Sequence, residues 1–454
     1  MQIDQKRIAK LRTRELERFK RERPRSMALW KRASNSMPNG VPMAWMVELY
    51  EHPPLFVQQG AGAYITDVDG HRYLDMNLAD TSMPLGYGLE TLTVAATSRM
   101  KQGSQFLLPD ENSIYVAEEL ARRFGMPKWQ FTLAGSSANS EAIRLSRAVT
   151  GRDGILMFAG KYHGMLDETL VASEDGERFA EGKGLPSDSL QHSHIVEFND
   201  LNAVEACLRN ESVACVITEP VLTNIGIIIP EPGFLTGLRQ LTRQYGCLLI
   251  IDEAHTNVCA FGGLTREWQL EPDILTLCKA IGGGVAIGAY GMTNNLAQSL
   301  EVSCASEGPT FGTGQTVATG GTLFANALSM ATTRAALENV MTEGAHSRAN
   351  KLGQRLANGI VAAIHRNGLE WSTYRCYCRS GYFFGSELPR NAMEAHQHED
   401  LTLRGLIRLY LANRGIWEAI SSASPGVSFT ATEQDIDFYL DVFERCLAEL
   451  KEAP

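Results

Sequence analysis

The sequence Leu277-Cys278-Lys279-Ala280-Ile281-Gly282-Gly283-Gly284 places one lysine at the entry to a run of glycines. Upstream, Asp252 closes the apolar run Cys247-Leu248-Leu249-Ile250-Ile251. A short apolar run of this length is typical of a buried strand. We therefore predict a strand that ends in a carboxylate, followed along the chain by a lysine on a flexible turn.

The middle of the chain, from about residue 85 to residue 325, alternates short apolar runs with helical stretches. Residues 154–158, 214–218 and 247–251 are such runs. This alternation predicts an α/β domain with a large, mainly parallel sheet. Ligands bind such sheets at the carboxyl ends of the strands, where Asp252 and Glu219 lie.

The first residues of the chain form a separate pattern. Residues 5–23 are rich in Lys and Arg, apolar residues recur there at helical spacing, and Pro24 ends the pattern. We expect an amphipathic helix that lies on the body of the protein or on a partner subunit. A nucleic-acid-binding arm is the alternative, which the acidic chain as a whole disfavours.

The other flanking segments predict a smaller α+β domain. Residues 63–67 and 71–75 surround Val68-Asp69-Gly70 and predict a β-hairpin. Helical patterns at 327–340 and 433–450 enclose strand-like pieces such as residues 381–385.

Three segments follow from these patterns. Residues 1–75 carry the N-terminal helix and a small-domain segment, residues 76–325 the large cofactor-binding α/β domain, and residues 326–454 the C-terminal small α+β domain.

Composition narrows the class of protein. The chain has 454 residues, a length that predicts more than one domain. Its net charge of -10 argues against nucleic-acid binding. We find no apolar run long enough to span a membrane and no apolar signal core at the start. Nine scattered cysteines predict free thiols, so we expect a cytoplasmic enzyme.

Lys279 and Asp252 together fit the chemistry of pyridoxal 5′-phosphate (PLP). A lysine amine forms a Schiff base with the cofactor aldehyde. A buried aspartate holds a proton on the pyridine nitrogen, so that the ring can accept electrons. Asp252 and His255 could instead be metal ligands, but no further ligand stands at a suitable spacing, and we predict no metal. The glycines after Lys279 lack the GxGxxG pattern of a dinucleotide loop.

Two further motifs fit the same cofactor. Gly135 and Ser136 precede a helical run, where free N–H groups could hold a phosphate; a plain N-cap is the alternative for these small residues. Tyr162 could stack on a pyridine ring and His163 could carry a proton. An ordinary strand-to-loop junction is the alternative for this pair.

From about residue 36 onward the chain resembles class III PLP-dependent aminotransferases of fold type I, with glutamate-1-semialdehyde aminomutase as the nearest branch. Residues 271–291 match the lysine motif of that family. The resemblance implies catalytic roles for Lys279 and Asp252, and it implies a two-fold homodimer with shared active sites, in which Gly321-Thr322 reaches the phosphate of the neighbouring subunit. The cofactor-binding residues that we predict are Gly135, Ser136, Tyr162, His163, Glu219, Asn224, Asp252, His255, Lys279 and Thr322.

The chain also departs from the family. Ala134 and Ser137 stand where the phosphate-binding turn usually has Ser and Glu, and His255 follows the usual Asp-Glu-Val position. Met46 stands where the aminomutase branch has an Arg that binds the substrate carboxylate, and Met cannot make such a pair. The aminomutase substrate is therefore disfavoured, unless another arginine such as Arg408 or Arg414 takes this role.

We predict an aminotransferase that moves an amino group between an amine or amino acid and a keto or aldehyde acceptor through a Lys279 Schiff base. One alternative is an ammonia-lyase acting on a β-hydroxy amine, such as a hydroxylated amino-phosphonate, which needs no acceptor. An aminomutase is another, and a PLP-binding regulatory protein without turnover is a third.

Overall fold

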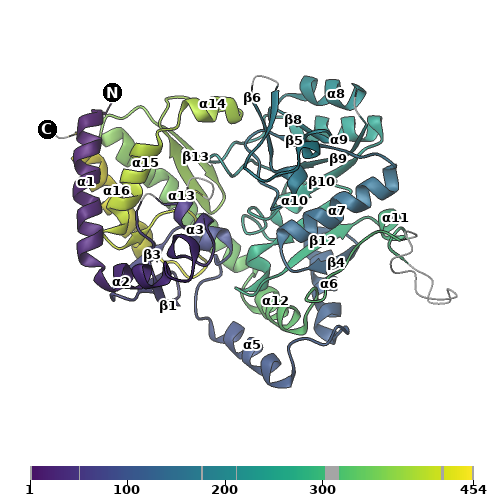
Figure 1. Cartoon of the computed structure of the whole chain (residues 1–454), viewed down its shortest axis with the longest axis horizontal. Helices are drawn as coiled ribbons and strands as arrows, with labels where there is room; N and C mark the ends of the chain where they lie inside the picture. The colour runs from purple at the N-terminus through teal and green to yellow at the C-terminus, as the bar shows by residue number, and fades with distance from the viewer. Residues whose placement is uncertain are drawn as a thin grey trace. The chain divides into compact units, whose positions relative to one another are not determined.

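The computed structural model describes residues 3–50, 52–174, 177–210, 212–301, 316–420 and 424–451. The chain divides into two compact units (Figure 1). One comprises residues 91–343 and 389–394, and the other residues 1–90, 344–388 and 395–454. The three segments predicted from the sequence stay a prediction.

The first unit is built on a seven-stranded sheet within the described part of the chain, with strand order β4-β12-β11-β10-β9-β5-β8. The pairs from β11 to β8 are all parallel, and β12 is antiparallel to both of its neighbours. The predicted mainly parallel sheet is therefore confirmed. The strands are β4 (Lys128–Thr132), β5 (Gly154–Phe158), β8 (Ser193–Val196), β9 (Val213–Thr218), β10 (Leu248–Asp252), β11 (Ile274–Cys278) and β12 (Gly288–Met292).

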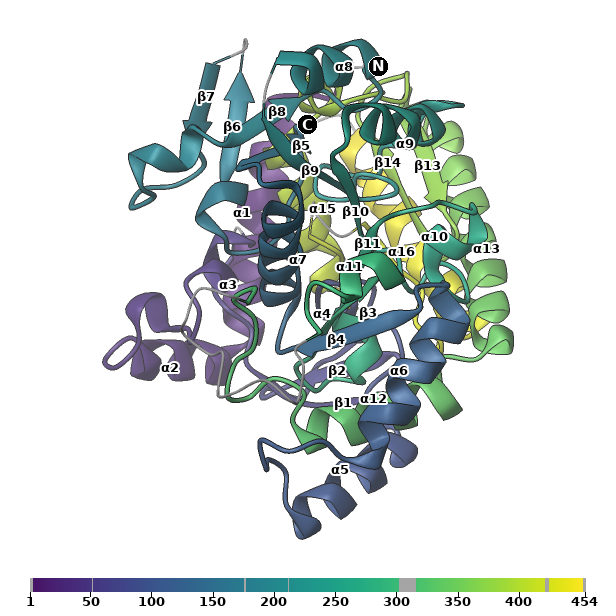
Figure 2. The same ribbon diagram turned by 90° about the vertical axis from the view of Figure 1, so that its right-hand side faces the viewer.

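Helices cover this sheet, which explains why its strands are apolar without alternation. The helix α7 (Gly135–Thr150) packs on β4, β9, β10, β11 and β12 (Figure 2). Ile155, Ile250 and Ile274 have no exposed surface and belong to the core under this helix. Adjacent to the sheet, β6 (Val171–Glu174) and β7 (Glu177–Ala180) pair as a separate antiparallel ribbon.

The other helices of this unit surround the sheet or extend from it, with α8 on β8, α9 on β10 and α12 on α6. They are α5 (Glu90–Gln102), α6 (Glu111–Phe124), α8 (Leu201–Asn210), α9 (Phe234–Tyr245), α10 (Gly263–Glu267), α11 (Asn294–Ala297) and α12 (Ala327–Asn339), with short 3₁₀ turns η2 (Asp167–Thr169), η3 (Ser187–Leu190) and η4 (Lys279–Gly282).

The second unit holds a four-stranded sheet of order β1-β2-β3-β15 and a two-stranded sheet β13-β14. The predicted hairpin is present, because β2 and β3 pair antiparallel around Gly70, whose φ is 93°. The strands are β1 (Val57–Ala61), β2 (Tyr64–Asp67), β3 (Arg72–Asp75), β13 (Ser372–Cys376), β14 (Arg379–Phe383) and β15 (Ile416–Trp417).

The predicted N-terminal helix is α1 (Gln5–Glu22), and it packs on α15 (Leu401–Ala412) within this unit. Phe19 is fully buried there against Leu409 and Ala412, which confirms an amphipathic helix lying on the body. Pro24 ends α1 but also begins a helix that the sequence did not predict, α2 (Pro24–Ala33). Proline suits the first turn of a helix, where its missing N–H has no partner to lose.

The remaining helices include the predicted C-terminal one, α16. They are η1 (Pro38–Gly40), α3 (Trp45–Glu48), α4 (Leu78–Thr81), α13 (Glu343–Arg366), α14 (Ala392–Gln397) and α16 (Glu433–Lys451). Within the residues that the structure describes, none of the helices has the combination of length and apolar character that crossing a bilayer requires.

The second unit buries a carboxyl group, that of Glu418, next to β15. Its Oε2 accepts a hydrogen bond of 2.8 Å from the Tyr439 hydroxyl. Burial raises the pKa of Glu418 to about 7, although the hydrogen bond from Tyr439 and the charges of Arg408 and Arg404 act in the opposite direction. Glu418 therefore stays protonated in the folded protein at pH values where an unfolded chain has already ionised it.

We predict that Glu418→Gln makes the protein more resistant to unfolding at pH 8 but not at pH 5. Between the ordinary pKa of 4.5 and the folded pKa of about 7, the folded state binds more protons than the unfolded state, so stability falls as pH rises. The amide cannot ionise, so the variant should gain roughly 2–3 kcal/mol over the wild type at pH 8. Denaturant unfolding at both pH values measures this.

The half-buried carboxylate Glu444 provides the control, because its hydrogen bond from Arg366 lowers its pKa. Glu444→Gln should gain no stability at pH 8. An unchanged pH slope in Glu418→Gln would contradict the prediction.

Candidate active site at the carboxyl end of the parallel sheet

The predicted site residues come from loops that leave one edge of the sheet. The strands β5, β9, β10 and β11 run parallel, so their carboxyl ends meet there. Each of these ends is followed by predicted site residues. They are Tyr162 and His163 after β5, Glu219 and Asn224 after β9, Asp252 and His255 at and after β10, and Lys279 after β11.

Asp252 is the last residue of β10 and is only 3% exposed. Its Oδ2 accepts a 2.8 Å hydrogen bond from Asn139 Nδ2 and lies 2.9 Å from His163 Nδ1. Its Oδ1 accepts from the backbone N–H of Ala254 at 2.9 Å. Strand β10, helix α7 and the loop after β5 thus meet at a single carboxyl group.

The hydrogen bonds around Asp252 decide its charge. Burial raises the pKa of this carboxyl, but the hydrogen bond and positive charge of His163, with the donors of Ala254 and Asn139, outweigh burial. The pKa of Asp252 therefore lies below its ordinary value, and the group is a carboxylate at neutral pH. A fixed negative charge is what a protonated pyridine nitrogen needs beside it.

Two polar atoms around Asp252 have no partner among the described residues. They are His163 Nε2 and Asn139 Oδ1, both buried. A buried polar atom left without a hydrogen bond costs about 1–3 kcal/mol. Unsatisfied polar atoms at a strand edge are therefore consistent with a bound polar group at this position.

Lys279 begins the 3₁₀ turn η4, directly after β11. Its φ of 57° is left-handed, a conformation that costs an ordinary residue energy and is found disproportionately at functional sites. Its Nζ contacts His255 Nε2. The lysine is thus held in a specific orientation at the same edge as Asp252.

Behind His255 the hydrogen bonds continue to a buried carboxyl. His255 Nδ1 lies 2.6 Å from the Thr223 hydroxyl, which in turn bonds to Glu219. The other oxygen of Glu219 accepts from Asn224 Nδ2 at 3.2 Å. The structure therefore joins Lys279, His255, Glu219 and Asn224 through Thr223.

The predicted phosphate turn forms the start of α7. The helix begins at Gly135, and the N-cap residue Ala134 has no side chain that could accept a hydrogen bond. The alternative that the serines cap the helix is therefore wrong, since Ser136 and Ser137 lie inside it. A helix start without a side-chain cap presents N–H groups and a positive dipole end to an anion.

Close packing explains the glycines around this turn. A Cβ at Gly135 would lie 2.7 Å from Cys278 Sγ, so only glycine allows the end of β11 to approach. The hydroxyl of Ser136 accepts from the N–H of Met165 at 3.0 Å, and a Cβ at Gly164 would lie 2.5 Å from Ser136 Oγ. The loop that carries Tyr162 and His163 is thus fastened to the start of α7.

Two predicted residues are placed differently. Tyr162 is 41% exposed, so one side of its ring is accessible. Thr322 is exposed, and its carbonyl accepts a hydrogen bond from Gln105 rather than from another predicted site residue. Its predicted contact is with a neighbouring subunit, which this single chain does not contain.

The sequence did not single out Asn139 or Thr223. Asn139 lies one helical turn after Gly135, on the same face of α7, and that spacing is a signal that could have been used. Thr223 has no such signal, because only the fold of the loop after β9 brings its hydroxyl between Glu219 and His255.

The sequence model of the family described as aminotransferase class-III matches residues 46–447. The chain belongs to this family. PLP, the cofactor predicted from the sequence, is confirmed with it. The residues present fit PLP, with the uncapped start of α7 for a phosphate, the Asp252 carboxylate for a ring nitrogen and the Lys279 amine for an aldehyde.

Several known proteins are similar to this aminotransferase class-III chain. A glutamate-1-semialdehyde 2,1-aminomutase from Chloroflexus aggregans is 33% identical over 87% of this chain and 91% of its own. The crystal structure of a glutamate-1-semialdehyde-aminomutase from Pseudomonas aeruginosa PAO1 superposes with a TM-score of 0.93 at 34% identity, covering 99% of this chain and 100% of that chain. An omega-transaminase from Sphaerobacter thermophilus superposes with a TM-score of 0.86 at 27% identity, covering 94% of this chain and 98% of that chain. These structures confirm the predicted fold class, fold type I.

We predict that Asp252→Asn folds normally but lowers the turnover rate on the order of 100-fold, as expected when a preorganised charge is lost from a site. The side chain keeps its shape, but it no longer carries the negative charge that favours a protonated ring nitrogen. Stopped-flow absorbance with an accepted amine measures the rate.

The matched control is Asp273→Asn, at the opposite end of β11, where Asp273 pairs with Arg239 at 2.6 Å. That variant loses a carboxylate of the same sheet away from the site and should turn over at close to the wild-type rate. Equal rates in Asp252→Asn and the wild type would remove Asp252 from the reaction.

Proposed function

We propose that this enzyme is an aminotransferase that moves an amino group between a small amine or amino acid and a keto or aldehyde acceptor. The observation that carries the proposal is the position of two groups on neighbouring parallel strands. Asp252 pairs in register with Thr276 of β11, and Lys279 follows at the end of that strand. A fixed carboxylate and a lysine amine are thereby held at one sheet edge.

The residues would act on different parts of the cofactor, namely its ring, its phosphate and its aldehyde. Bound PLP supplies an electron sink for the carbon that carries the amine. Asp252 holds a proton at the pyridine nitrogen, and His163 and Asn139 orient Asp252. The N–H groups at Gly135 and Ser136 would bind the phosphate, and Tyr162 would contact the ring. Lys279 is the residue that would hold the cofactor aldehyde in the resting enzyme.

Lys279 also moves the proton of the reacting carbon. When it is not bonded to the cofactor, the Lys279 amine would act as a base that takes the proton from that carbon and returns a proton elsewhere. Its contact with His255 and the left-handed backbone at Lys279 support this role, because both fix where the amine points.

An ammonia-lyase is the second candidate, and the contact between Lys279 and His255 favours it. A lysine base paired with a histidine can remove a proton from one carbon, while an acid protonates the hydroxyl on the adjacent carbon so that it leaves as water. Such an enzyme would act on β-hydroxy amines, including hydroxylated amino-phosphonates, and would release ammonia without an acceptor.

An aminomutase is the third candidate, supported by the names of the relatives that are 31–34% identical to this chain. Met46 on α3 speaks against their substrate, since a thioether cannot pair with a carboxylate. The alternatives Arg408 and Arg414 are engaged within the second unit, with the Leu49 carbonyl and with Glu15.

We predict that amine donors bleach the visible absorbance of the PLP-bound enzyme and that turnover then requires a 2-oxo acid or aldehyde acceptor. A panel of amines, assayed with and without acceptor while free ammonia is measured, separates the candidates. Release of one ammonia per amine consumed, without any acceptor, would show that the enzyme is a lyase and not an aminotransferase. An isomeric amine formed without either ammonia or acceptor would establish the aminomutase.

The same assay tests the lysine. Lys279→Ala should abolish both the visible band and turnover, whereas Lys128→Ala, at a surface ion pair with Glu301, should preserve both. Turnover by Lys279→Ala near the wild-type rate would refute the proposed site.

We further propose that the enzyme is a homodimer in which Thr322 reaches the partner's phosphate site. Large apolar side chains are exposed around α5, the following loop and the start of α6, with Leu107 and Leu108 exposed by 70% and 72%. A contiguous group of this kind typically marks an interface. The exposed residues are Val94, Met100, Phe106, Leu107, Leu108, Ile114 and Leu323.

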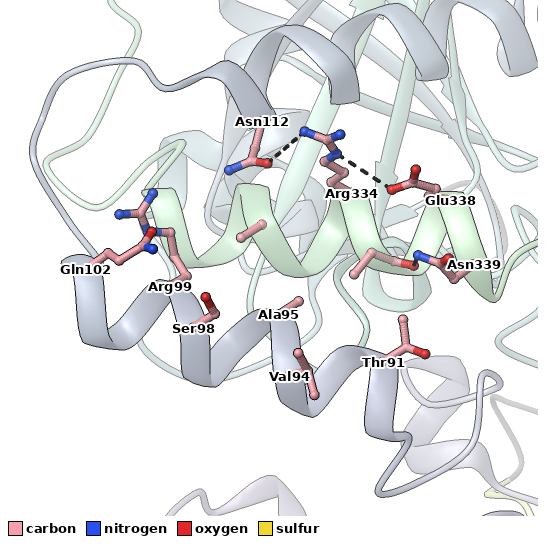
Figure 3. A pocket seen from close by; sticks show the side chains of 12 residues that line it. Thr91, Val94, Ala95, Ser98, Arg99, Gln102, Asn112, Arg334, Glu338 and Asn339 are labelled. Carbon is pink, nitrogen blue, oxygen red and sulfur yellow. Dashed lines mark hydrogen bonds and ion pairs between the residues drawn. The ribbon is translucent and has the colours of Figure 1, made fainter.

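A hollow of about 330 Å³ between α5 and α12 lies within this region (Figure 3). Val94 and Ala95 of α5 line it on one side, and Arg334 and Glu338 of α12 on the other. Arg334 lies 3.6 Å from Glu338, so a polar rim accompanies the apolar side chains. An apolar surface with a polar rim fits a second copy of the chain.

We predict that the double variant Leu107→Asp with Leu108→Asp is monomeric and binds PLP about tenfold more weakly, since each site loses the partner's donors. Light scattering gives the mass. Leu401→Asp, at an apolar side chain that is 65% exposed on α15, is the control and should remain dimeric. A dimeric double variant would place the interface elsewhere.

A cytoplasmic location remains part of the proposal. No disulfide joins the cysteines of the described residues, and most of these thiols are buried, which suits a reducing compartment. Cys304 lies outside the described residues.

A further inference from the structure

Lys279 stands at the end of a line of side chains that leads to a buried carboxylate. Lys279 Nζ contacts His255 Nε2, His255 Nδ1 lies 2.6 Å from Thr223 Oγ1, and that hydroxyl bonds to Glu219. Glu219, Thr223 and His255 are all buried. A continuous line of buried polar groups ending at the reacting amine is the arrangement by which proteins orient a histidine for proton transfer.

The donors and acceptors along this line fix the tautomer of the histidine. Glu219 accepts from Thr223 N–H at 3.4 Å and from Asn224 at 3.2 Å, besides the Thr223 hydroxyl. Three donors on a carboxyl group favour its ionised form, which can only accept. The Thr223 hydroxyl must then donate to Glu219, so its oxygen accepts from the N–H at His255 Nδ1. The lone pair of His255 therefore lies on Nε2, toward Lys279.

We propose that His255 is a catalytic residue that receives protons from Lys279 and returns them, and that Thr223 and Glu219 are positioning residues that hold the accepting nitrogen toward the amine. The inference rests on the proposed role of Lys279. The simplest reaction in which this proton transfer would occur is the attachment of the cofactor to Lys279.

The proton balance of this attachment shows what His255 does. The Lys279 ammonium first gives up one proton, and the free amine then bonds through Nζ to the aldehyde carbon. The nitrogen gives up a second proton and keeps the third, while the aldehyde oxygen breaks from that carbon and leaves as water with two protons. Nothing is oxidised or reduced. His255 Nε2 takes each proton from the nitrogen and delivers it to the departing oxygen.

Ordinary lysine and histidine side chains differ in proton affinity by about four pH units. Because lysine is ordinarily the stronger base of the two, His255 in this proposal accepts the proton only while the reaction proceeds. Transfer by a positioned side chain typically accelerates a step by about 10²–10⁴-fold. Other titratable side chains near these strand ends include Asp252, Glu253, Tyr162, His163 and Cys278, and none of them is changed in the variants below.

Two substitutions separate hydrogen bonding from proton transfer. His255→Gln keeps an amide oxygen that can accept from Lys279 but cannot take up a proton, and His255→Leu removes both functions. The first measurement uses the full chain freed of cofactor, in which acetic anhydride acylates Lys279 and mass spectrometry follows the product. Only the unprotonated amine reacts, and this reaction needs no proton transfer from the enzyme.

We expect His255→Leu to acylate about three- to tenfold faster at pH 8, because the ammonium has lost its acceptor, and His255→Gln to acylate at the wild-type rate. The second measurement is the rate at which added PLP develops its visible band. Here His255→Gln should be about 10-fold slower or more, like His255→Leu.

The positioning residues have a matched control. Thr223→Val should slow PLP attachment several-fold and Thr223→Ser should restore it. Thr256→Val removes a similarly buried hydroxyl, 2.8 Å from the neighbouring carboxyl of Glu253, and should leave the rate unchanged. Equal slowing in both valine variants would indicate general loosening of the loops and overturn the inference.

Other outcomes also decide the matter. PLP attachment at the wild-type rate in His255→Gln would leave His255 as a hydrogen-bond acceptor only and refute proton transfer, while the proposed aminotransferase would stand. Borohydride reduction that fixes PLP to a residue other than Lys279 would refute both.

Discussion

The parallel pairing of β9, β10 and β11 is the constraint on which the site depends. Parallel strands end at the same edge, and the register sets which side chain appears there, with Asp252 opposite Thr276. A slip of one residue would turn Asp252 to the other face of the sheet. The strands are buried on both faces, so their fixed register depends on packing against α7 and its neighbours as well as on the ladder of hydrogen bonds.

Two charged groups at this edge of the sheet, Asp252 and Lys279, have different surroundings. Asp252 is surrounded by hydrogen-bond donors that lower its pKa, so its carboxylate keeps its negative charge. Lys279 is held against His255, a side chain whose ordinary pKa lies near neutrality, so that a proton can move. In the proposed mechanism the charge of Asp252 stays fixed, and protons are exchanged at Lys279 and His255.

Much of the fold could be predicted because its strands are simple apolar runs. The strand predicted at 154–158 is β5 in full, and the lysine motif lies where a strand end should place it. Local rules failed where a local signal had two meanings. Ser136 and Ser137 suit an N-cap, but the helix starts before them, and Pro24 stops one helix while opening another. Thr223 was missed because its role depends on a loop conformation, which no periodicity encodes.

The departures of this chain from its family acquire a physical reason in the structure. A serine at the position of Ala134 would cap α7 with its own hydroxyl and compete for the N–H groups of the first turn. Alanine leaves those groups to a ligand, and the approach of Cys278 to Gly135 keeps the turn compact without a capping side chain. His255 in turn brings a titratable ring to the lysine, and it is useful there only because Thr223 and Glu219 orient it. The unusual histidine is thus supported by residues of a different loop, and this support fits the proton transfer proposed for it.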